Sequence, residues 1–414
     1  MVHSPDSGVT WNPVSSGVVG NLNAITRFAG RWVAVGGDGT LTSSADGVTW
    51  TPTSSGTIRD LRGIAWHNGL WVAVGDSILT STDGVAWTDR TLSSPDTFGR
   101  DRYSVIHAGS QWVATTYGAV LTSPDGITWE KRPVGDKNRA VAWNGSRLIV
   151  VGGIEAGSNS TARVDLSDDG GLTWTTQPFG AGFLRGIVWT GSQFVIVGDG
   201  GRIYTSPTGA AGTWTTQTSG TDLNLRGVMT ESGGLVAVGG QFLSGPVILT
   251  SPDGVTWTPR TAPTTQLLYS ISKAGSLYVA TGYDGVVLTS PDAVTWTART
   301  TPTTHELYAA AWDGTQLLVA GEAGTILAST GRESLPLDWK SVVPLPGPDF
   351  GVRLTWFSTS ERIYDIESTT TLAPPWLPIP GSPRTATGPE AFIDFTEPGP
   401  SAASRRFFRV RERP

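Results

Sequence analysis

Leu121-Thr-Ser-Pro-Asp-Gly-Ile-Thr-Trp129 is the stretch that decides the fold, because close copies of it recur along the chain. Two of them are Thr250-Ser-Pro-Asp-Gly-Val-Thr-Trp257 and Thr289-Ser-Pro-Asp-Ala-Val-Thr-Trp296. Weaker copies end at Trp11, Trp50, Trp87, Trp174 and Trp214, so successive copies lie roughly 37 to 45 residues apart. A fixed period of this length is typical of an array in which each repeat is one four-stranded sheet.

The second complete repeat shows what each unit builds. Leu61–Trp66 reads as a short strand, and Leu70–Gly75 as an almost continuous apolar strand whose two faces are both buried. Ser77–Ser81 reads as a third strand, Asp83-Gly84 as a tight hairpin turn, and Val85–Thr88 as the start of a fourth strand. Each repeat therefore predicts four antiparallel strands.

The apolar second strand counts the units. It recurs as Trp32–Gly36, Trp71–Gly75, Trp112–Thr115, Leu148–Gly152, Phe194–Gly198, Leu235–Gly239, Tyr278–Gly282 and Leu318–Gly321. The sequence therefore predicts an all-β protein whose main part is an eight-bladed β-propeller. Seven blades are the alternative, if one unit is not a blade of its own.

The two ends of the repeat array are complementary. After Ile326–Thr330 the last unit continues into Gly331-Arg332 and has no fourth strand of its own. Residues 4–11 carry a copy of the repeated phrase with no strands before it. We therefore expect residues 2–13 to pair with Ile326–Thr330, so that the N-terminal strand closes the ring and leaves no exposed sheet edge.

Composition agrees with many short strands and argues against several classes of partner. The 414 residues include 53 Gly, 27 Pro and 18 Trp, with only 15% charged residues. The formal net charge of −6 gives no overall attraction to nucleic acid or to an anionic membrane. Without Cys the chain has neither disulfides nor thiolate metal ligands. Four scattered histidines, His3, His67, His107 and His305, do not suggest a metal site, so no metal or cofactor is expected.

The repeated phrase also carries a family resemblance. Ser4-x-Asp6-x-Gly8-x-Thr10-Trp11 and Ser167-x-Asp169-x-Gly171-x-Thr173-Trp174 resemble the Asp-box (BNR) motif S-x-D-x-G-x-T-W of sialidases, some β-glucanases and photosystem II assembly-factor propellers. The resemblance spans roughly residues 2–330, and the copy at Ser206 departs from it with Thr208 in place of Asp. It implies a structural turn on the outer edge of each blade, built on Asp6, Asp46, Asp83, Asp125, Asp169, Asp253 and Asp292. The alternative is that these carboxylates bind calcium or act as general acids.

Composition changes after Thr330, and three segments are expected: a propeller at 1–331, a Pro-rich linker at 332–349, and a small β-sandwich at 350–414. The last segment contains four alternating stretches, Val352–Trp356, Arg362–Glu367, Ala391–Phe395 and Arg406–Arg411. It resembles the fibronectin-like modules that end many secreted bacterial surface proteins. This resemblance implies an extracellular or cell-surface protein. Because Met1-Val2-His3-Ser4-Pro5 shows no export signal, a cytoplasmic location is the alternative.

The innermost strands indicate where a ligand would bind. A small residue, which lets the strands crowd the axis, occupies one aligned position: Ala24, Gly63, Ser104, Ala140, Gly186, Gly227, Ser270 and Ala309. The residue just before it, at the channel mouth, is Asn23, Arg62, Tyr103, Arg139, Arg185, Arg226, Tyr269 or Tyr308. The four Arg and three Tyr form the candidate ligand site. On the same face Asp38, Asp76, Glu155, Asp199, Asp284 and Glu322 could pair with the arginines and fill the channel instead.

These features favour a monomeric, non-catalytic scaffold that binds a protein or a glycan at the channel mouth. The alternatives are a sialidase-like or other glycoside hydrolase and a purely structural surface protein. A sialidase would need three arginines on a carboxylate, a Tyr nucleophile assisted by Glu, and an acid Asp. No Phe-Arg-Ile-Pro phrase, which supplies the first sialidase arginine, precedes the first Asp-box.

Overall fold

The computed structural model describes residues 2–4, 11–92, 104–156, 159–231, 234–312, 317–329, 339–344, 350–357, 363–369, 377–378, 384–385, 390–397 and 407–412. The chain divides into two compact units, Met1–Gly331 and Arg332–Pro414. The described residues form β-strands and four short 3-10 turns, with no α-helix among them. Accordingly, this part of the chain contains no helix that could span a bilayer.

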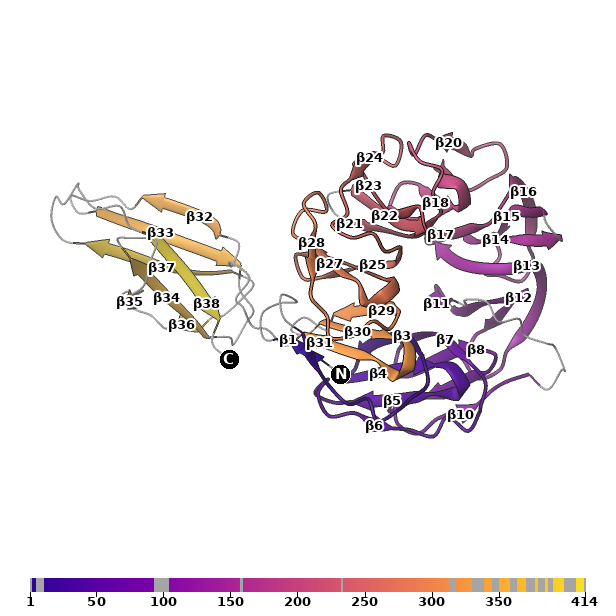
Figure 1. Ribbon diagram of the computed structural model, residues 1–414, viewed down its shortest axis with the longest axis horizontal. Helices are drawn as coiled ribbons and strands as arrows, with labels where there is room; N and C mark the ends of the chain where they lie inside the picture. The colour runs from indigo at the N-terminus through magenta and orange to yellow at the C-terminus, as the bar shows by residue number, and fades with distance from the viewer. Residues whose placement is uncertain are drawn as a thin grey trace. The chain divides into compact units, whose positions relative to one another are not determined.

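The first unit consists of seven hydrogen-bonded sheets that follow one another around a ring (Figure 1). Five of the sheets have four antiparallel strands. Two of them come first in the chain: β3 (Leu22–Phe28), β4 (Arg31–Gly36), β5 (Leu41–Ser44) and β6 (Thr51–Pro52), and then β7 (Leu61–His67), β8 (Leu70–Gly75), β9 (Ile78–Ser81) and β10 (Thr88–Asp89). Two more are β17 (Leu184–Trp189), β18 (Phe194–Gly198), β19 (Ile203–Ser206) and β20 (Thr215–Gln217), and β21 (Leu225–Glu231), β22 (Gly234–Gln241), β23 (Gly245–Ser251) and β24 (Thr258–Arg260). The fifth is β25 (Leu268–Ala274), β26 (Leu277–Gly282), β27 (Val287–Ser290) and β28 (Thr297–Arg299).

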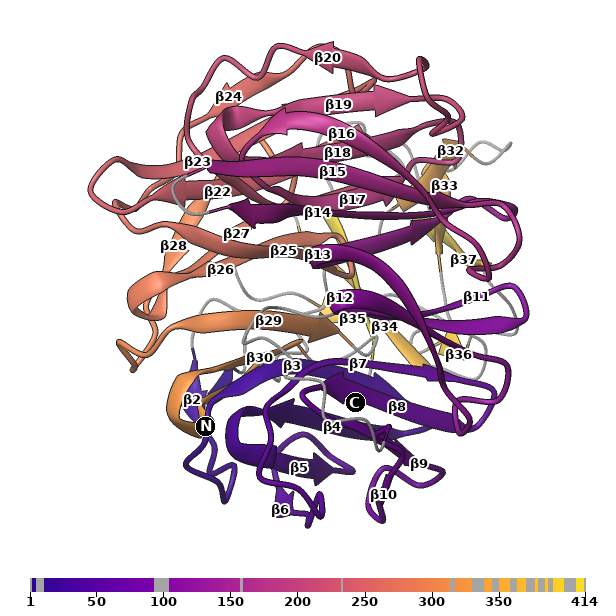
Figure 2. The same cartoon turned by 90° about the vertical axis from the view of Figure 1, so that its right-hand side faces the viewer.

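The sixth sheet has six strands. They are β11 (Val105–Ala108), β12 (Gln111–Ser123), β13 (Glu130–Trp143), β14 (Leu148–Ala156), β15 (Asn159–Ser167) and β16 (Thr175–Ala181). β12 and β13 are unusually long, with 13 and 14 residues (Figure 2). Two predicted repeats are therefore joined here by continuous strands.

The seventh sheet combines the two ends of the first unit. It holds β29 (Leu307–Trp312), β30 (Leu317–Gly321) and β31 (Ile326–Ser329), with β1 (Val2–Ser4) parallel and β2 (Asn12–Pro13) antiparallel to β31. The N-terminal segment thus pairs where the sequence predicts, although it does so through two short strands. Trp11, between them in sequence, is 7% exposed and packs in one apolar cluster with Val279 and Val319.

Alternate residues of each second strand face opposite neighbours, which explains why these strands are apolar throughout. In β4, Trp32 and Ala34 pack with Leu318 and Ile326 of the preceding sheet. Val33 and Val35 pack instead with β7 to β9 of the following sheet. The core is therefore a series of apolar layers between adjacent sheets, as expected when both faces of a strand are buried.

A glycine ends the second strand where the chain must pass very close to it. A Cβ atom on Gly36 would lie 1.6 Å from the carbonyl oxygen of Asn21, and one on Gly321 would lie 2.1 Å from that of Glu306. Only a residue without a side chain allows this approach. The backbone just before the innermost strands β3 and β29 packs directly against these glycines.

The second unit contains two sheets. One is β32 (Trp339–Pro344), β33 (Phe350–Phe357) and β37 (Glu390–Glu397), and the other is β34 (Ile363–Thr369), β35 (Leu377–Pro378), β36 (Arg384–Thr385) and β38 (Phe407–Glu412). β32 lies inside the segment 332–349 that the sequence assigned to a Pro-rich linker. It pairs with β33 because Lys340-Ser-Val-Val343 is a short run able to extend a sheet, and the flanking prolines mask it in the sequence.

Candidate functional site

The described residues of the predicted channel mouth share one backbone feature. At each of them the register between the innermost strand and its neighbour shifts by one residue, which is a β-bulge. The bulged residues are Asn23, Arg62, Arg139, Arg185, Arg226, Tyr269 and Tyr308. A bulge turns its extra side chain out of the regular pairing pattern. Tyr103, the eighth member of the set, lies outside the described residues.

A cavity of about 710 Å³ connects several of these positions. Its lining includes Asn23 and Arg62 from the first two sequence repeats, Arg139 from the fourth repeat and Tyr308 from the last repeat. The innermost strands β29, β3 and β7 are neighbours in the ring, and β13 lies further round it (Figure 1). Side chains that are distant in sequence therefore face one common space.

Two of the four arginines are held by carboxylates. Arg62 Nη2 lies 2.6 Å from Asp60 Oδ2. Arg185 donates from Nε to Asp199, and both of these side chains are about four-fifths buried. Arg62 and Arg185 are therefore neutralised by the protein's own carboxylates, as in the channel-filling alternative.

The other two arginines lie against aromatic rings. Arg139 Cζ is 5.1 Å from the centroid of the Phe183 ring, and Arg226 Cζ is 5.7 Å from that of Tyr269. Both distances are within the range of a cation–π interaction. An aromatic ring attracts a cation but does not neutralise it, so these contacts differ from the two ion pairs.

Arg226 is the least compensated charge of the site. Within the described part of the chain it has no hydrogen bond or ion pair, and its buried Nε has no acceptor. Burial and the nearby positive charges of Arg185 and, to a smaller extent, Arg139 lower the pKa of Arg226, while Tyr269 and the carboxylate of Asp199 act in the opposite direction. Three arginines therefore converge closely enough to repel one another.

Tyrosines and glutamates occupy another part of the mouth. The rings of Tyr269 and Tyr308 lie 5.8 Å apart between centroids, tilted by 43°. Burial and the carboxylate of Glu306, to which it is hydrogen-bonded, raise the pKa of Tyr308. Glu322 Oε2 in turn accepts a hydrogen bond from the backbone N–H of Glu306 at 3.3 Å.

The carboxylates at the mouth coincide in part with those chosen from the sequence, since Asp38 lines the cavity and Glu322 accepts a hydrogen bond from the backbone of Glu306. Of the six expected, Asp199 contacts an arginine, whereas Asp284 accepts a hydrogen bond from Gln266 and the side chain of Glu155 lies outside the described residues. Asp60 and Glu306 were missed. Each stands two residues before a mouth residue, Arg62 or Tyr308, and this spacing is the signal that could have identified them.

The Asp-box carboxylates bind their own turns. Asp125 Oδ1 accepts backbone N–H groups from Ile127 and Thr128 at 2.8 and 2.7 Å and the hydroxyl of Ser123 at 3.0 Å. Trp129 Nε1 then donates to the Gly126 carbonyl at 2.8 Å. The carboxylate contacts recur at Asp46, Asp83, Asp169, Asp253 and Asp292, but at the Asp83 turn the buried Trp87 Nε1 has no hydrogen-bond partner among the described residues. Asp6 lies outside the described residues.

The pKa values of these carboxylates reflect the turn. Burial acts to raise the pKa of Asp46, but hydrogen bonds from Thr49, Val48 and Ser44 outweigh it and lower the pKa to about 2. The pKa of Asp169 falls to about 2 for the same reasons. Such groups stay ionised above about pH 4 and stabilise the folded state there.

Replacing Asp125 with alanine is expected to lower the free energy of unfolding by about 0.5 to 1.5 kcal/mol, because the turn loses hydrogen bonds from two backbone N–H groups. Ligand binding at the channel mouth is expected to stay unchanged. Urea titration and a binding assay on the same variant provide the check. A selective loss of binding at unchanged stability would contradict a structural role.

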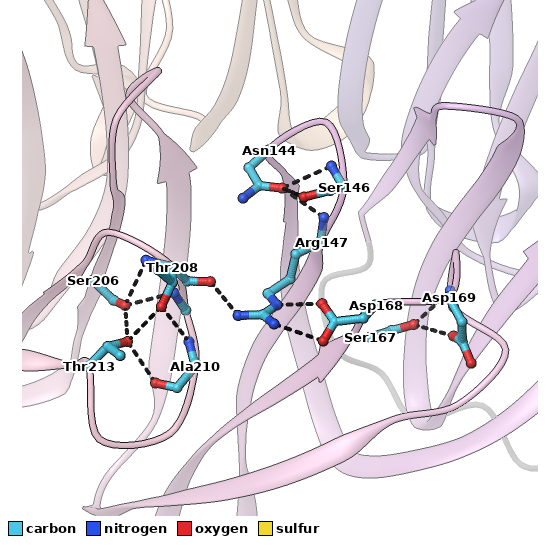
Figure 3. A network of polar contacts seen from close by, with 12 residues as sticks. Asn144, Ser146, Arg147, Ser167, Asp168, Asp169, Ser206, Thr208, Ala210 and Thr213 are labelled. Atoms are coloured by element: carbon cyan, nitrogen blue, oxygen red, sulfur yellow. Dashed lines mark hydrogen bonds and ion pairs between the residues drawn. The ribbon is translucent and has the colours of Figure 1, made fainter.

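Neighbouring turns are also tied to each other (Figure 3). Arg147 donates to both carboxylate oxygens of Asp168 at 2.5 and 2.7 Å and to the Thr208 carbonyl at 2.6 Å. Thr208 replaces the usual Asp, and in this turn the Thr213 hydroxyl lies 2.5 Å from that of Ser206. Arg147 thus joins an intact Asp-box to the degenerate one beside it.

Two of the four histidines come together. The rings of His67 and His107 are stacked 3.5 Å apart between centroids, with Trp112 edge-on to both. Burial and the adjacent His67 lower the pKa of His107. Among the described residues, no group of three or more His, Asp or Glu side chains is arranged to hold a metal ion.

Comparisons with known proteins concern the fold. No protein-family model matches the chain, and no curated protein does. Among solved structures it is similar to Sqt1 of Chaetomium thermophilum, with a TM-score of 0.60 and 14% identity over 80% of this chain and 99% of that one. YCF48 of Cyanidioschyzon merolae gives 0.51 and 14% over 78% and 99%, and a structure described as YCF48 bound to D1 peptide gives 0.50 and 16% over 81% and 99%. These neighbours are β-propellers, and the main part of this chain has the same fold.

Proposed function

We propose that this protein is a non-catalytic scaffold that binds an anionic group of a protein partner at the channel mouth. The observation that carries the proposal is the Arg226 guanidinium, which is partly buried among other arginines and has no carboxylate partner in the described part of the chain. A partly buried cation that shares its nearest carboxylate, Asp199, with another arginine is costly. A carboxylate bound beside Arg226 would remove this cost and gain charge-assisted hydrogen bonds.

The proposal includes a finer architecture. β12 contains residues of two predicted strands, Trp112–Thr115 and Leu121–Ser123, and β13 continues from the outer strand of one repeat into the inner strand of the next. Counted in this way the six-stranded sheet represents two blades, and the ring has eight with Asp-box turns at its outer edge. We also propose that the C-terminal unit is a fibronectin-like β-sandwich of an exported protein.

A protein segment is favoured over a glycan as the ligand. One similar propeller, YCF48, is described as bound to a D1 peptide. The side chains at the mouth suit a peptide because arginines bind carboxylates in a bidentate manner and tyrosines pack against side chains. Glycan binding is the outcome expected if the tyrosines rather than the arginines dominate recognition.

Arg226→Met is expected to weaken binding of an acidic peptide by about 1.5 to 3 kcal/mol, roughly 10- to 150-fold. An array of acidic peptides and a glycan array, screened with the purified protein, would supply the probes. The loss is expected to shrink as salt rises if the site is open to solvent. Thermal stability should hold or increase slightly, because one of the converging charges is gone.

Arg260→Met is the matched control, since it removes the same charge from the outer strand β24, where Arg260 Nε contacts the Thr250 hydroxyl at 2.8 Å. It is expected to leave binding unchanged. Equal effects of the two variants, or none from Arg226→Met, would overturn the proposal and favour a purely structural surface protein.

One observation favours a second candidate, glycoside hydrolysis. Tyr308 is hydrogen-bonded to Glu306, which is the pairing of a Tyr nucleophile with an assisting Glu that a sialidase would need. The raised pKa of Tyr308 keeps its hydroxyl protonated and argues against this reading. Hydrolysis of a fluorogenic sialoside that is lost in Tyr308→Phe would establish it.

A further inference from the structure

The mouth cavity is lined by both cationic and anionic side chains. Arg62 and Arg139 line it together with Asp38 and Asp60, and the charges of Arg139 and Arg185 reach Arg226 beside it. Glu306 and Tyr308 line the same cavity. A ligand that occupies this space therefore meets guanidinium groups as well as carboxylate and phenol groups.

The carboxylates of Glu306 and Glu322 are not neutralised by the described arginines of the mouth. Neither Glu306 nor Glu322 forms an ion pair within the described part of the chain, where the mouth ion pairs are those of Arg62 with Asp60 and Arg185 with Asp199. The Glu322 carboxylate instead accepts the backbone N–H of Glu306, which brings two like charges into the same region. Two neighbouring carboxylates are stabilised by a cation placed between or beside them.

The ring of Tyr308, which lines the cavity with Glu306, adds a second attraction for a cation. Tyrosine faces attract an alkylammonium or guanidinium group, and nearby carboxylates strengthen the effect. The cavity volume of about 710 Å³ also exceeds what a single carboxylate fills and lies in the range that holds a drug-sized ligand. Space therefore remains for a second, positively charged side chain of the same ligand.

Resting on the proposed function, we propose that the partner segment carries a lysine or arginine a few residues from the carboxylate that binds Arg226, and that this side chain binds against Glu306 and Tyr308. The ligand then binds Arg226 through its carboxylate and Glu306 through its cation at the same time. Simultaneous binding would select this charge pattern over a uniformly acidic segment.

The test uses fluorescein-labelled hexapeptides with a free C-terminal carboxylate, in which lysine or its uncharged analogue norleucine is placed at each position in turn. Affinity is measured by fluorescence anisotropy with the wild-type protein, Glu306→Gln, Arg226→Met and the control Glu130→Gln. Glu306→Gln keeps a hydrogen-bonding group beside Tyr308, and Glu130 lies on the exposed part of β13 next to Arg132. Thermal melts show that each variant is folded.

At one or two positions, lysine is expected to bind the wild type about 5- to 30-fold more tightly than norleucine. Glu306→Gln should abolish the difference between the lysine and norleucine peptides, and Glu130→Gln should keep it. If lysine gives no advantage at any position, or the advantage survives Glu306→Gln, the two-ended ligand is wrong even where Arg226→Met weakens every peptide. If no peptide depends on Arg226, the proposed function fails and this inference fails with it.

Discussion

Replacing Asp165 with alanine is expected to lower the free energy of unfolding by about 3 to 5 kcal/mol, because the change leaves a buried arginine without its counter-charge. The Asp165 and Arg163 side chains on β15 are only 1% and 10% exposed, and they form an ion pair. The Thr176 hydroxyl also donates to Asp165 Oδ1 at 2.6 Å. Urea titration of the variant provides the measurement.

The double variant Arg163→Met/Asp165→Leu is the informative control. It replaces both charges with apolar side chains of similar size and is expected to recover most of the lost stability, since well-packed apolar groups often substitute for a buried ion pair. A single variant no less stable than the wild type, or a double variant worse than the single one, would show that this ion pair has a different role.

A chain that begins at Val14 is expected to melt well below the full chain and to associate. It loses β1 and β2, which leaves the edge of β31 unpaired. It also loses Trp11, whose buried ring packs between two sheets; removal of such a ring alone costs about 3 to 5 kcal/mol. Thermal melts and size-exclusion chromatography with light scattering measure both effects.

Trp11→Ala in the full chain separates the two causes. It removes the ring but keeps the strands, so it is expected to lower the melting temperature without association. If the chain beginning at Val14 kept the full melting temperature and remained monomeric, the N-terminal segment would not be what closes the ring.

The β-propeller fold could be predicted because burial of a strand determines which residue types it contains, and the pattern is the same in each repeat. Val33 and Ala34 face opposite neighbours, so the second strand has to be apolar at every position and stands out in the sequence. The long strands β12 and β13 could not be predicted. Several other units turn between their second and third strands through a short 3-10 segment such as η1 (Gly37–Gly39) or η4 (Glu322–Gly324), whereas β12 continues through Tyr117 and Gly118. Whether a chain bends or continues at such a point depends on neighbouring strands that a single repeat does not reveal.

The candidate site could be predicted only as a set of aligned positions. Alignment of the innermost strands identified the column that contains Arg62 and Arg226. It could not tell that Asp60 binds the first of these while Tyr269 lies beside the second. The two environments differ because the neighbouring side chains come from short loops and adjacent strands, where the repeat varies most. The presence of an arginine at one of these aligned positions therefore does not show whether that arginine already has a carboxylate partner.

The β-bulges have a consequence for how the proposed binding surface can evolve. Because each mouth residue is the extra residue of its bulge, it is opposed by no partner residue of its own in the adjacent strand. A codon change at such a position alters the recognition chemistry while the strand pairing on either side persists. Duplicated repeats can therefore diverge one mouth residue at a time, and the mixture of Asn23, four arginines and the tyrosines is the kind of mosaic that such independent drift and selection produce. Grafting a new specificity onto this scaffold would accordingly begin with combinatorial libraries at these positions alone.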